Sequence, residues 1–377
     1  MARTSHYTLS RKLFDLHWPM IFIICMLGAI GVAILYSASR GDMDPWASRH
    51  LTRFVFMIPV MILIALVDIQ FWARTAYWLY AGGVLLLIIV EVVGIFGKGA
   101  QRWVNIGGMN FQPSEYMKIA LVLAMARYYH FVHVNEVNRL MVLAPPLAMI
   151  GFPALLILHQ PNLGTATIVC MTGVAVMFFA GLAWRYIIAA AVVGLSALPV
   201  IWALMHDYQK RRVYTFLDPE SDPLGAGYNI MQSKIAIGSG QLLGKGFLEG
   251  SQSQLNFLPE KQTDFIFTML AEEFGMVGGM GVIFLYVLLI AMGFRVAFSS
   301  HSQFGRLVSG GISTVLFIHL FINVAMVMGL IPVVGVPLPL LSYGGSVLIA
   351  MMIGFGFVLN AYIYRDVSNF RGIRDLL

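Results

Sequence analysis

Long apolar runs separated by short polar loops make up most of the chain. About 20 apolar residues in a helix span the hydrocarbon of a membrane, so each run is a candidate transmembrane helix. The runs cover residues 19–36, 54–67, 77–96, 116–131, 141–158, 165–184, 186–205, 265–294, 307–334 and 340–364. The pattern predicts an all-α polytopic membrane protein with about ten transmembrane helices.

One polar segment, residues 206–263, is much longer than the other loops and lies between the seventh and eighth apolar runs. Its scattered apolar residues predict short amphipathic helices that lie on the membrane. We therefore expect residues 1–377 to form a single integral membrane domain, with residues 206–263 as its one large loop.

Composition agrees with a membrane protein: 59% of residues are hydrophobic, 11% are charged and the mean hydropathy is +0.80. The net charge of +6 comes from basic residues spread over many loops, so nucleic acid is not an expected partner. Anionic lipid head groups and phosphates fit this distribution better. Cys25 and Cys170 both fall inside apolar runs, which excludes a disulfide framework.

The distribution of Lys and Arg predicts the orientation of the helices. With ten spans, both termini lie on the same side. Short loops on that side hold twelve Lys and Arg residues, against five in the opposite short loops. Positive residues favour the cytoplasmic side. Both termini are therefore predicted to be cytoplasmic, and residues 206–263 extracytoplasmic.

The first concentration of polar residues on the predicted outer face is the junction 97–118. Ser114 is expected to cap a helix there, with Glu115 in its first turn. Glu115 and Lys118 are three residues apart and share a helix face. They form either a charge pair that lets two ionisable side chains lie near the interface, or a site in which Lys118 binds a substrate phosphate and Glu115 positions it.

Two further junctions on this face hold candidate functional residues. Asp264 directly precedes the eighth apolar run, and a carboxylate at a membrane entrance is a candidate functional group. The segment 323–346 contains prolines that prevent a continuous helix. Broken backbone at membrane depth must be packed in protein or line a cavity. This segment is either a re-entrant packing loop or a ligand site with Ser342 and Tyr343 at its end.

The strings at these junctions resemble those of the SEDS family (shape, elongation, division and sporulation), and the resemblance covers all ten predicted spans. The matching strings are GAQRW at 99–103, FQPSE at 111–115 with Lys118, QPNLGT at 160–165, NFLPEKQTDFIF with AEEFG at 256–275, and GLIPVVGVPLPLLSYGGS at 329–346. QRW and FLPEKQTDFIF are more similar to the elongation branch than to the division branch. Two positions depart from the family pattern: Asn162 replaces a usual Asp, and Val347 replaces a usual small residue.

The resemblance implies a peptidoglycan glycosyltransferase of the bacterial inner membrane. Such an enzyme polymerises lipid II into glycan strands for cell elongation and rod shape, and releases undecaprenyl diphosphate. Its implied ligands are lipid II and undecaprenyl-linked glycan. Its implied partners are a class B penicillin-binding protein, which crosslinks the product, and the membrane proteins of the elongation complex.

Glycosyl transfer requires a base for the acceptor hydroxyl and positive charge near the departing diphosphate. Asp264 is the candidate base. Arg102 and Lys118 are candidates for the diphosphate, with Glu115 orienting Lys118 and Ser342 near the opening to the bilayer. A divalent cation, Mg²⁺ or Mn²⁺, is compatible with a diphosphate, but the sequence contains no cluster of metal ligands that requires one.

Two alternatives come from other functional classes. A transporter or lipid flippase would explain the proline-broken helices and the polar residues Glu91, His319 and Asn323 within apolar runs. Against it, the favoured charged residues gather on one face instead of the midplane, and Glu91 and His319 are expected to be packed or partnered. A non-catalytic scaffold for a penicillin-binding protein is the other alternative, but a scaffold has no need of Asp264.

The orientation can be tested with reporter fusions. A reporter fused after Leu377 should lie in the cytoplasm, and one inserted near Ser251 should lie outside it, because of the bias in the short loops. A cytoplasmic signal at Ser251 would contradict the assignment of the outer face.

Overall fold

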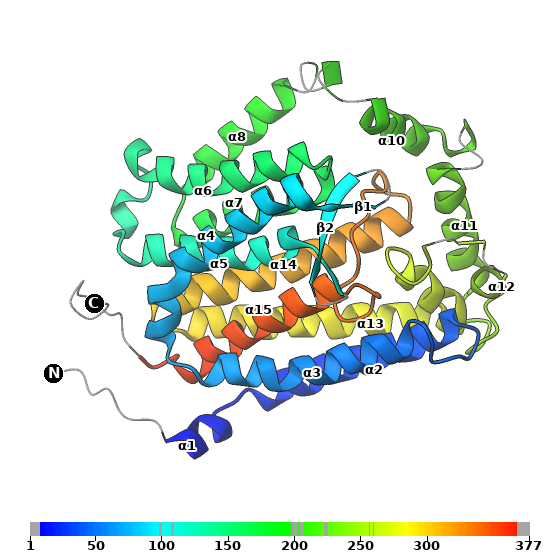
Figure 1. Cartoon of the computed structure of the whole chain (residues 1–377), viewed down its shortest axis with the longest axis horizontal. Coiled ribbons are helices and arrows are strands. Elements are labelled where there is room, and N and C mark those ends of the chain that lie inside the picture. The colour runs from blue at the N-terminus through cyan, green and yellow to red at the C-terminus, as the bar shows by residue number, and fades with distance from the viewer. Residues whose placement is uncertain are drawn as a thin grey trace.

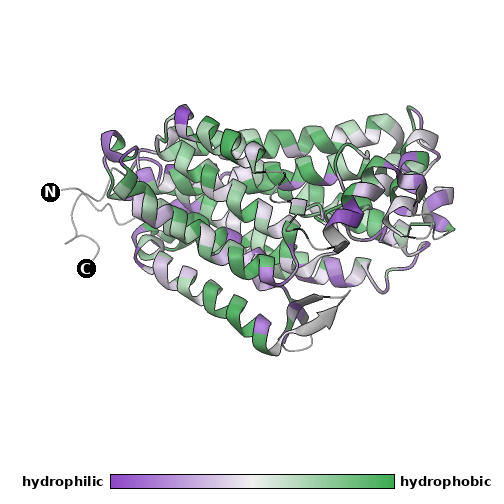
Figure 2. Cartoon of the chain, turned by 90° about the horizontal axis from the view of Figure 1, so that it is seen from above, coloured by the Kyte–Doolittle hydropathy of each residue, from purple (hydrophilic) through white to green (hydrophobic). Residues whose placement is uncertain are grey.

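The computed structural model describes residues 8–367 except 98–99, 107–108, 198, 200–201, 204, 206, 222–224, 256 and 259. Long helices lie side by side in a bundle (Figure 1). Helix α1 (Leu9–Phe14) and the last turn of α15 (Gly345–Ile363) lie at one end, and α11 (Ala226–Ser239) and α12 (Ser251–Gln254) lie at the other. We call this second end the loop end. Hydrophilic residues gather at both ends, while the helices between them are mostly apolar (Figure 2).

Eight helices in the described part of the chain are long and apolar enough to cross a membrane. They are α2 (Trp18–Ala38), α3 (Ala47–Leu66), α4 (Ile69–Val93), α6 (Leu140–His159), α7 (Leu163–Ala180), α13 (Ile266–Ser299), α14 (Gln303–Val327) and α15. Helices α5 (Pro113–His130) and α8 (Trp184–Ser196) correspond to the two other predicted spans. The predicted fold class is therefore confirmed. Helix α8 is shorter than the run 186–205, part of which lies outside the described residues.

The long polar segment 206–263 holds helical pieces between α8 and α13. They are α10 (Asp207–Leu217), the 3-10 helix η2 (Pro219–Ser221), α11 and α12. A second 3-10 helix, η1 (Val134–Glu136), lies between α5 and α6.

A small antiparallel sheet at the loop end was not predicted. Its strands β1 (Ile95–Gly97), β2 (Ala100–Ile106) and β3 (Met109–Phe111) connect α4 to α5 in the order β1-β2-β3. The predicted run 77–96 was too long because α4 ends at Val93 and Phe96 pairs with Gln101 in this sheet.

Local signals at the ends of α7 explain its bounds. The Asn162 side chain accepts a hydrogen bond from the Thr165 amide at 3.3 Å and caps the helix. Gly181 has a φ of 111°, a left-handed conformation that favours glycine and ends the helix. The predicted run 165–184 therefore stops at Ala180, and Trp184 begins α8 instead.

Helix α13 is longer than one membrane span and contains a break at Gly275. Its 34 residues would extend about 51 Å, against a hydrocarbon thickness of about 30 Å. Gly275 adopts a φ of 66° and interrupts the helix. Before the break, the carbonyls of Glu272 and Glu273 accept hydrogen bonds from the backbone amides of residues 245–246. After the break, the amides of residues 276–277 donate to the carbonyls of residues 241–242. All four bonds are 2.9–3.1 Å long.

Helices α5, α14 and α15 form the centre of the bundle. In α14 and α15, 78% and 83% of the most apolar window is buried, against 22% in α4. Almost every residue of α5 is buried as well, including its charged residues Glu115 and Lys118. Because α5 is surrounded by protein instead of lipid, a helix with two charges in its first half is tolerated there.

Candidate active site

The N-terminal end of α5 is joined to the N-terminal end of α15. The Gln112 amide donates to Ser346 Oγ at 2.9 Å, and the Gln112 side chain donates to Ser114 Oγ at 3.1 Å. Ser114 was expected to cap the helix, and this is wrong. Gln112 occupies the cap position without a side-chain cap bond, and the Ser114 hydroxyl instead accepts from its side chain.

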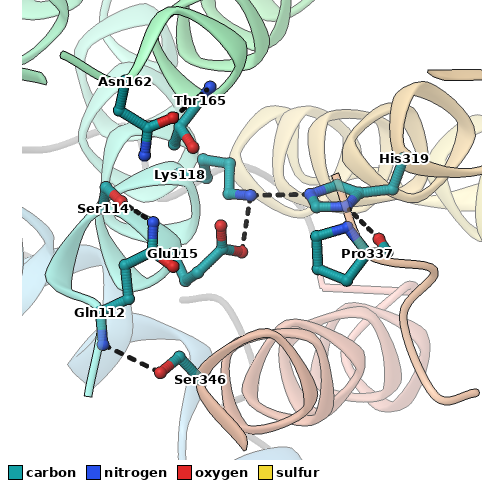
Figure 3. Close-up of polar contacts among 9 residues, drawn as sticks. All are labelled: Gln112, Ser114, Glu115, Lys118, Asn162, Thr165, His319, Pro337 and Ser346. Carbon is teal, nitrogen blue, oxygen red and sulfur yellow. Dashed lines mark hydrogen bonds and ion pairs between the residues drawn. The ribbon is translucent and has the colours of Figure 1, made fainter. Parts of the chain in front are cut away.

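Glu115, Lys118 and His319 form a buried polar chain inside this end of the bundle (Figure 3). Lys118 Nζ lies 2.7 Å from Glu115 Oε2 and 2.7 Å from His319 Nε2. His319 Nδ1 lies 3.1 Å from the carbonyl oxygen of Pro337. Lys118 and His319 are each 1% exposed and Glu115 is 4% exposed. His319 was expected to be a packed or partnered group, and its contacts with Lys118 and Pro337 confirm this.

The hydrogen bonds of this chain determine the protonation of the histidine ring. The Lys118 ammonium can only donate, so His319 Nε2 must accept. The ring is then neutral, and its proton is on Nδ1, which donates to the carbonyl of Pro337. The Lys118 charge itself is balanced by Glu115. Removing either partner of such a buried pair typically costs about 3–5 kcal/mol, since it leaves an uncompensated buried charge.

The segment 328–344, which we call the α14–α15 loop, has no regular secondary structure. Several of its carbonyls accept hydrogen bonds from side chains of the surrounding helices. Asn323 Nδ2 donates to Val336 O at 2.7 Å, His50 Nε2 lies 3.0 Å from Leu340 O, and the Tyr286 hydroxyl donates to the carbonyl of Pro339. The break in the backbone that the prolines of the segment 323–346 predicted is therefore present, and it is packed in protein.

Asp264 lies in the turn immediately before α13, beside the α14–α15 loop. Its carbonyl accepts a hydrogen bond from Asn323 Nδ2 at 2.9 Å. Its carboxylate faces Gly335, where an added Cβ would lie 3.3 Å from Asp264 Oδ2. Asp264 is partly exposed, whereas Glu115 and Lys118 are buried. Of these three candidate residues, Asp264 is therefore the most accessible to a substrate.

Ser342 holds the α14–α15 loop against the turn that carries Asp264. Its hydroxyl donates to the carbonyl of Thr263 at 2.7 Å and accepts from the amide of Leu338 at 2.8 Å. The neighbouring Tyr343 amide donates to Gln262 O at 2.8 Å. Ser342 is 3% exposed. The structure thus brings this predicted substrate-binding residue close to the candidate base, in a position that supports the loop.

Arg102 lies in β2 and contacts a different part of the protein. Its Nε donates to the carbonyl of Gln160 at 3.1 Å, and a second guanidinium nitrogen donates to the carbonyl of Pro161. Arg102 therefore holds the small sheet against the junction between α6 and α7. Arg102 as a whole is partly exposed, unlike the buried Lys118.

Lys261 is a further cation in the turn that carries Asp264. Burial lowers the pKa of Lys261, the positive charge of Arg40 lowers it further, and the negative charge of Glu273 opposes both effects.

Among the residues that the structure describes, no three His, Cys, Asp or Glu side chains gather to hold a metal ion. Glu115 is paired with Lys118. The described side chains therefore do not fit a divalent cation held by the protein alone.

Together these features define a helical membrane protein whose polar site lies at one end of the bundle, around a broken loop and a buried ion pair. Residues 17–366 match the family described as "Cell cycle protein", that of FtsW, RodA and SpoVE. The chain belongs to this family, in agreement with the resemblance in its motifs.

The relatives match the chain over most of its length. The peptidoglycan glycosyltransferase MrdB of Escherichia coli K12 is 45% identical over 357 residues, which cover 92% of this chain and 94% of MrdB. Stage V sporulation protein E of Bacillus subtilis is 34% identical over 354 residues, covering 92% of this chain and 96% of that protein.

Solved structures have the same fold. A chain from "Structural coordination of polymerization and crosslinking by a peptidoglycan synthase complex" is 31% identical, with a TM-score of 0.81 and coverage of 94% of this chain and 99% of that one. The rod shape determining protein RodA of Thermus thermophilus is 30% identical, with a TM-score of 0.70 and coverage of 93% and 97%.

Gly335 provides a test of how tightly the loop lies against Asp264. Its φ of 74° is left-handed, and a Cβ there would approach the carboxylate. Gly335→Ala should lower the free energy of unfolding by about 1–2 kcal/mol, the typical cost of a left-handed non-glycine residue. Thermal unfolding in detergent measures the change.

Gly281→Ala in α13 is the matched control, because a Cβ there meets open space. Alanine also favours a helix over glycine, so this variant should be as stable as the wild type or more stable. Equal unfolding midpoints for the wild type and Gly335→Ala would contradict the close approach.

Proposed function

We propose that the protein is a peptidoglycan glycosyltransferase that polymerises lipid II into glycan strands for cell elongation, with Asp264 as its catalytic base. Its relative MrdB is named a peptidoglycan glycosyltransferase and matches nearly the whole chain. The observation that carries the proposal is the position of Asp264, a partly exposed carboxylate at the start of α13, held by Asn323 beside the α14–α15 loop.

The reaction requires one proton to move and one bond to the diphosphate to break. The acceptor hydroxyl attacks the anomeric carbon of the donor sugar, forms the new glycosidic bond and gives its proton to the Asp264 carboxylate. The bond between the anomeric carbon and the diphosphate oxygen breaks, and undecaprenyl diphosphate leaves with the electron pair. Positive groups near the departing diphosphate lower the barrier by stabilising its developing charge.

Arg102 remains the candidate for contact with the diphosphate, since it is partly exposed, whereas Lys118 is buried. Direct binding of the phosphate by Lys118 remains a prediction. Two of its three N–H groups are directed at Glu115 and His319, and the side chain is 1% exposed. This geometry favours an indirect role for Lys118. Ser342 supports the loop and borders the site.

We also propose that the protein works beside a class B penicillin-binding protein in the bacterial inner membrane, with both termini in the cytoplasm. A structural relative belongs to a complex described as coordinating polymerization and crosslinking. The position of Asp264 directly after the long polar segment 206–263, together with the Lys and Arg bias of the short loops, supports an outward orientation of Asp264.

Purified Asp264→Asn tests the proposal. The amide keeps the shape and hydrogen-bonding reach of the carboxylate but cannot take a proton. Loss of a general base typically lowers a rate by about 10²–10⁴-fold. We expect wild-type protein to convert labelled lipid II into polymer that can be separated by size, and the variant to remain near background with an unchanged unfolding midpoint.

Glu249→Gln is the matched control, because Glu249 is an exposed carboxylate in the same long loop. It should polymerise at the wild-type rate. A wild-type rate in Asp264→Asn would exclude Asp264 as the base. Wild-type protein that makes no polymer, with or without its crosslinking partner, would favour the transporter or scaffold alternatives.

A further inference from the structure

His319 and Asn323 lie four residues apart on α14 and so face the same side of the helix. Both are buried, at 1% and 0% exposure. His319 Nδ1 donates to the carbonyl of Pro337, and Asn323 Nδ2 donates to the carbonyl of Val336. One face of α14 therefore holds two consecutive carbonyls of the α14–α15 loop.

Asn323 also binds the backbone of the candidate base. Its amide nitrogen lies 2.9 Å from the carbonyl oxygen of Asp264 and 2.7 Å from that of Val336. An amide NH₂ group has two donors, and two carbonyl oxygens lie within reach, which fixes the orientation of the side chain. A single amide thus joins the loop to the turn that carries Asp264.

His319 connects the same loop to the buried ion pair. Because the Lys118 ammonium donates to Nε2, the ring proton must be on Nδ1, where it donates to Pro337. Without that ammonium, Nε2 would lose its hydrogen-bond donor, and the bond to the Pro337 carbonyl alone would hold the ring. Lys118, balanced by Glu115, therefore supports the ring orientation in which His319 holds the loop.

We infer that His319 and Asn323 are positioning residues for Asp264, and that Glu115 and Lys118 act on the reaction through them without touching the substrate. This inference rests on the proposed function. The contacts form a continuous path from Glu115 through Lys118, His319 and the loop to Asn323 and Asp264. Figure 3 shows its first part, from Glu115 to Pro337.

The position of the loop matters because Gly335 directly precedes the held carbonyls and lies against the carboxylate of Asp264. A shift of the loop would displace the carboxylate from the acceptor hydroxyl. A misplacement of about 1 Å can lower a rate by about 10²-fold. Substrate binding would change little, since neither His319 nor Asn323 is exposed.

The first arm of the test compares two buried asparagines. Asn323→Leu keeps a similar volume and removes the donor to the loop and to Asp264. Asn360→Leu is the matched control, because Asn360 in α15 is also buried and also donates to backbone carbonyls, those of Ala65 and Val67 at the end of α3. Asn360 lies about 22 Å along α15 from its first residue, far from the loop.

Both variants should unfold at lower temperature, because each leaves buried carbonyls without a donor. Only Asn323→Leu should change the chemistry. We expect its kcat for lipid II polymerisation, per folded molecule, to fall by about 10–100-fold with an unchanged KM. Equal kcat values for Asn323→Leu and Asn360→Leu would overturn the positioning role and leave only a structural one.

The second arm separates positioning from direct phosphate binding by Lys118. His319→Phe and Lys118→Met should each lower kcat without raising KM, and the double variant should be no slower than the slower single variant, since both act along one path. If Lys118→Met raises KM while His319→Phe does not, or if the two losses multiply, the inference is wrong.

Lys118→Met leaves Glu115 buried without its partner and can lower the yield of folded protein. The variant Glu115→Gln with Lys118→Met removes that charge and gives the same prediction. Wild-type protein that makes no polymer would refute the proposed function itself. Wild-type protein that polymerises, combined with unaffected kcat in the His319 and Asn323 variants, would refute the positioning role alone.

Discussion

A backbone segment that leaves regular secondary structure at membrane depth must find other partners for its polar groups, and the site of this protein is built around that requirement. In the α14–α15 loop, carbonyls are held by His319 and Asn323 from α14, Tyr286 from α13 and His50 from α3. An unpaired buried carbonyl typically costs about 1–3 kcal/mol, so these side chains stabilise the loop in one conformation. The same conformation places Gly335 against Asp264.

The second interruption, in α13, is satisfied by different means. At Gly275 the free backbone groups pair with the backbone of residues 241–246 in the long polar segment, without side chains. Gly244 fits there with a φ of 83°, because a Cβ would clash with the carbonyl of Glu273. This pairing fastens the segment 206–263 to the first part of α13. The long loop is therefore part of the framework of the site.

The sequence predicted the features that depend on local pattern. Apolar runs indicated the spans, the position of Asp264 before such a run indicated an accessible carboxylate, and prolines indicated the broken loop. Contacts between distant residues could not be predicted in this way: Lys118 and His319 are 201 residues apart, and Ser342 and Thr263 are 79 apart. His319 and Asn323 were recognised only as polar residues within an apolar run, and nothing local showed that they meet a loop instead of a transport pathway.

The location of the buried ion pair follows from the architecture of the centre. Helix α5 is the least apolar of the central helices and is almost entirely enclosed by protein, so Glu115 and Lys118 are kept from lipid and are paired with each other. A buried pair of this kind contributes little net stability compared with apolar residues of similar volume. Its retention at this site is better explained by a specific task. Here that task is to hold the His319 ring from its Nε2 side, and with it the loop that faces Asp264, so a charge that never meets the substrate can still influence where the base lies.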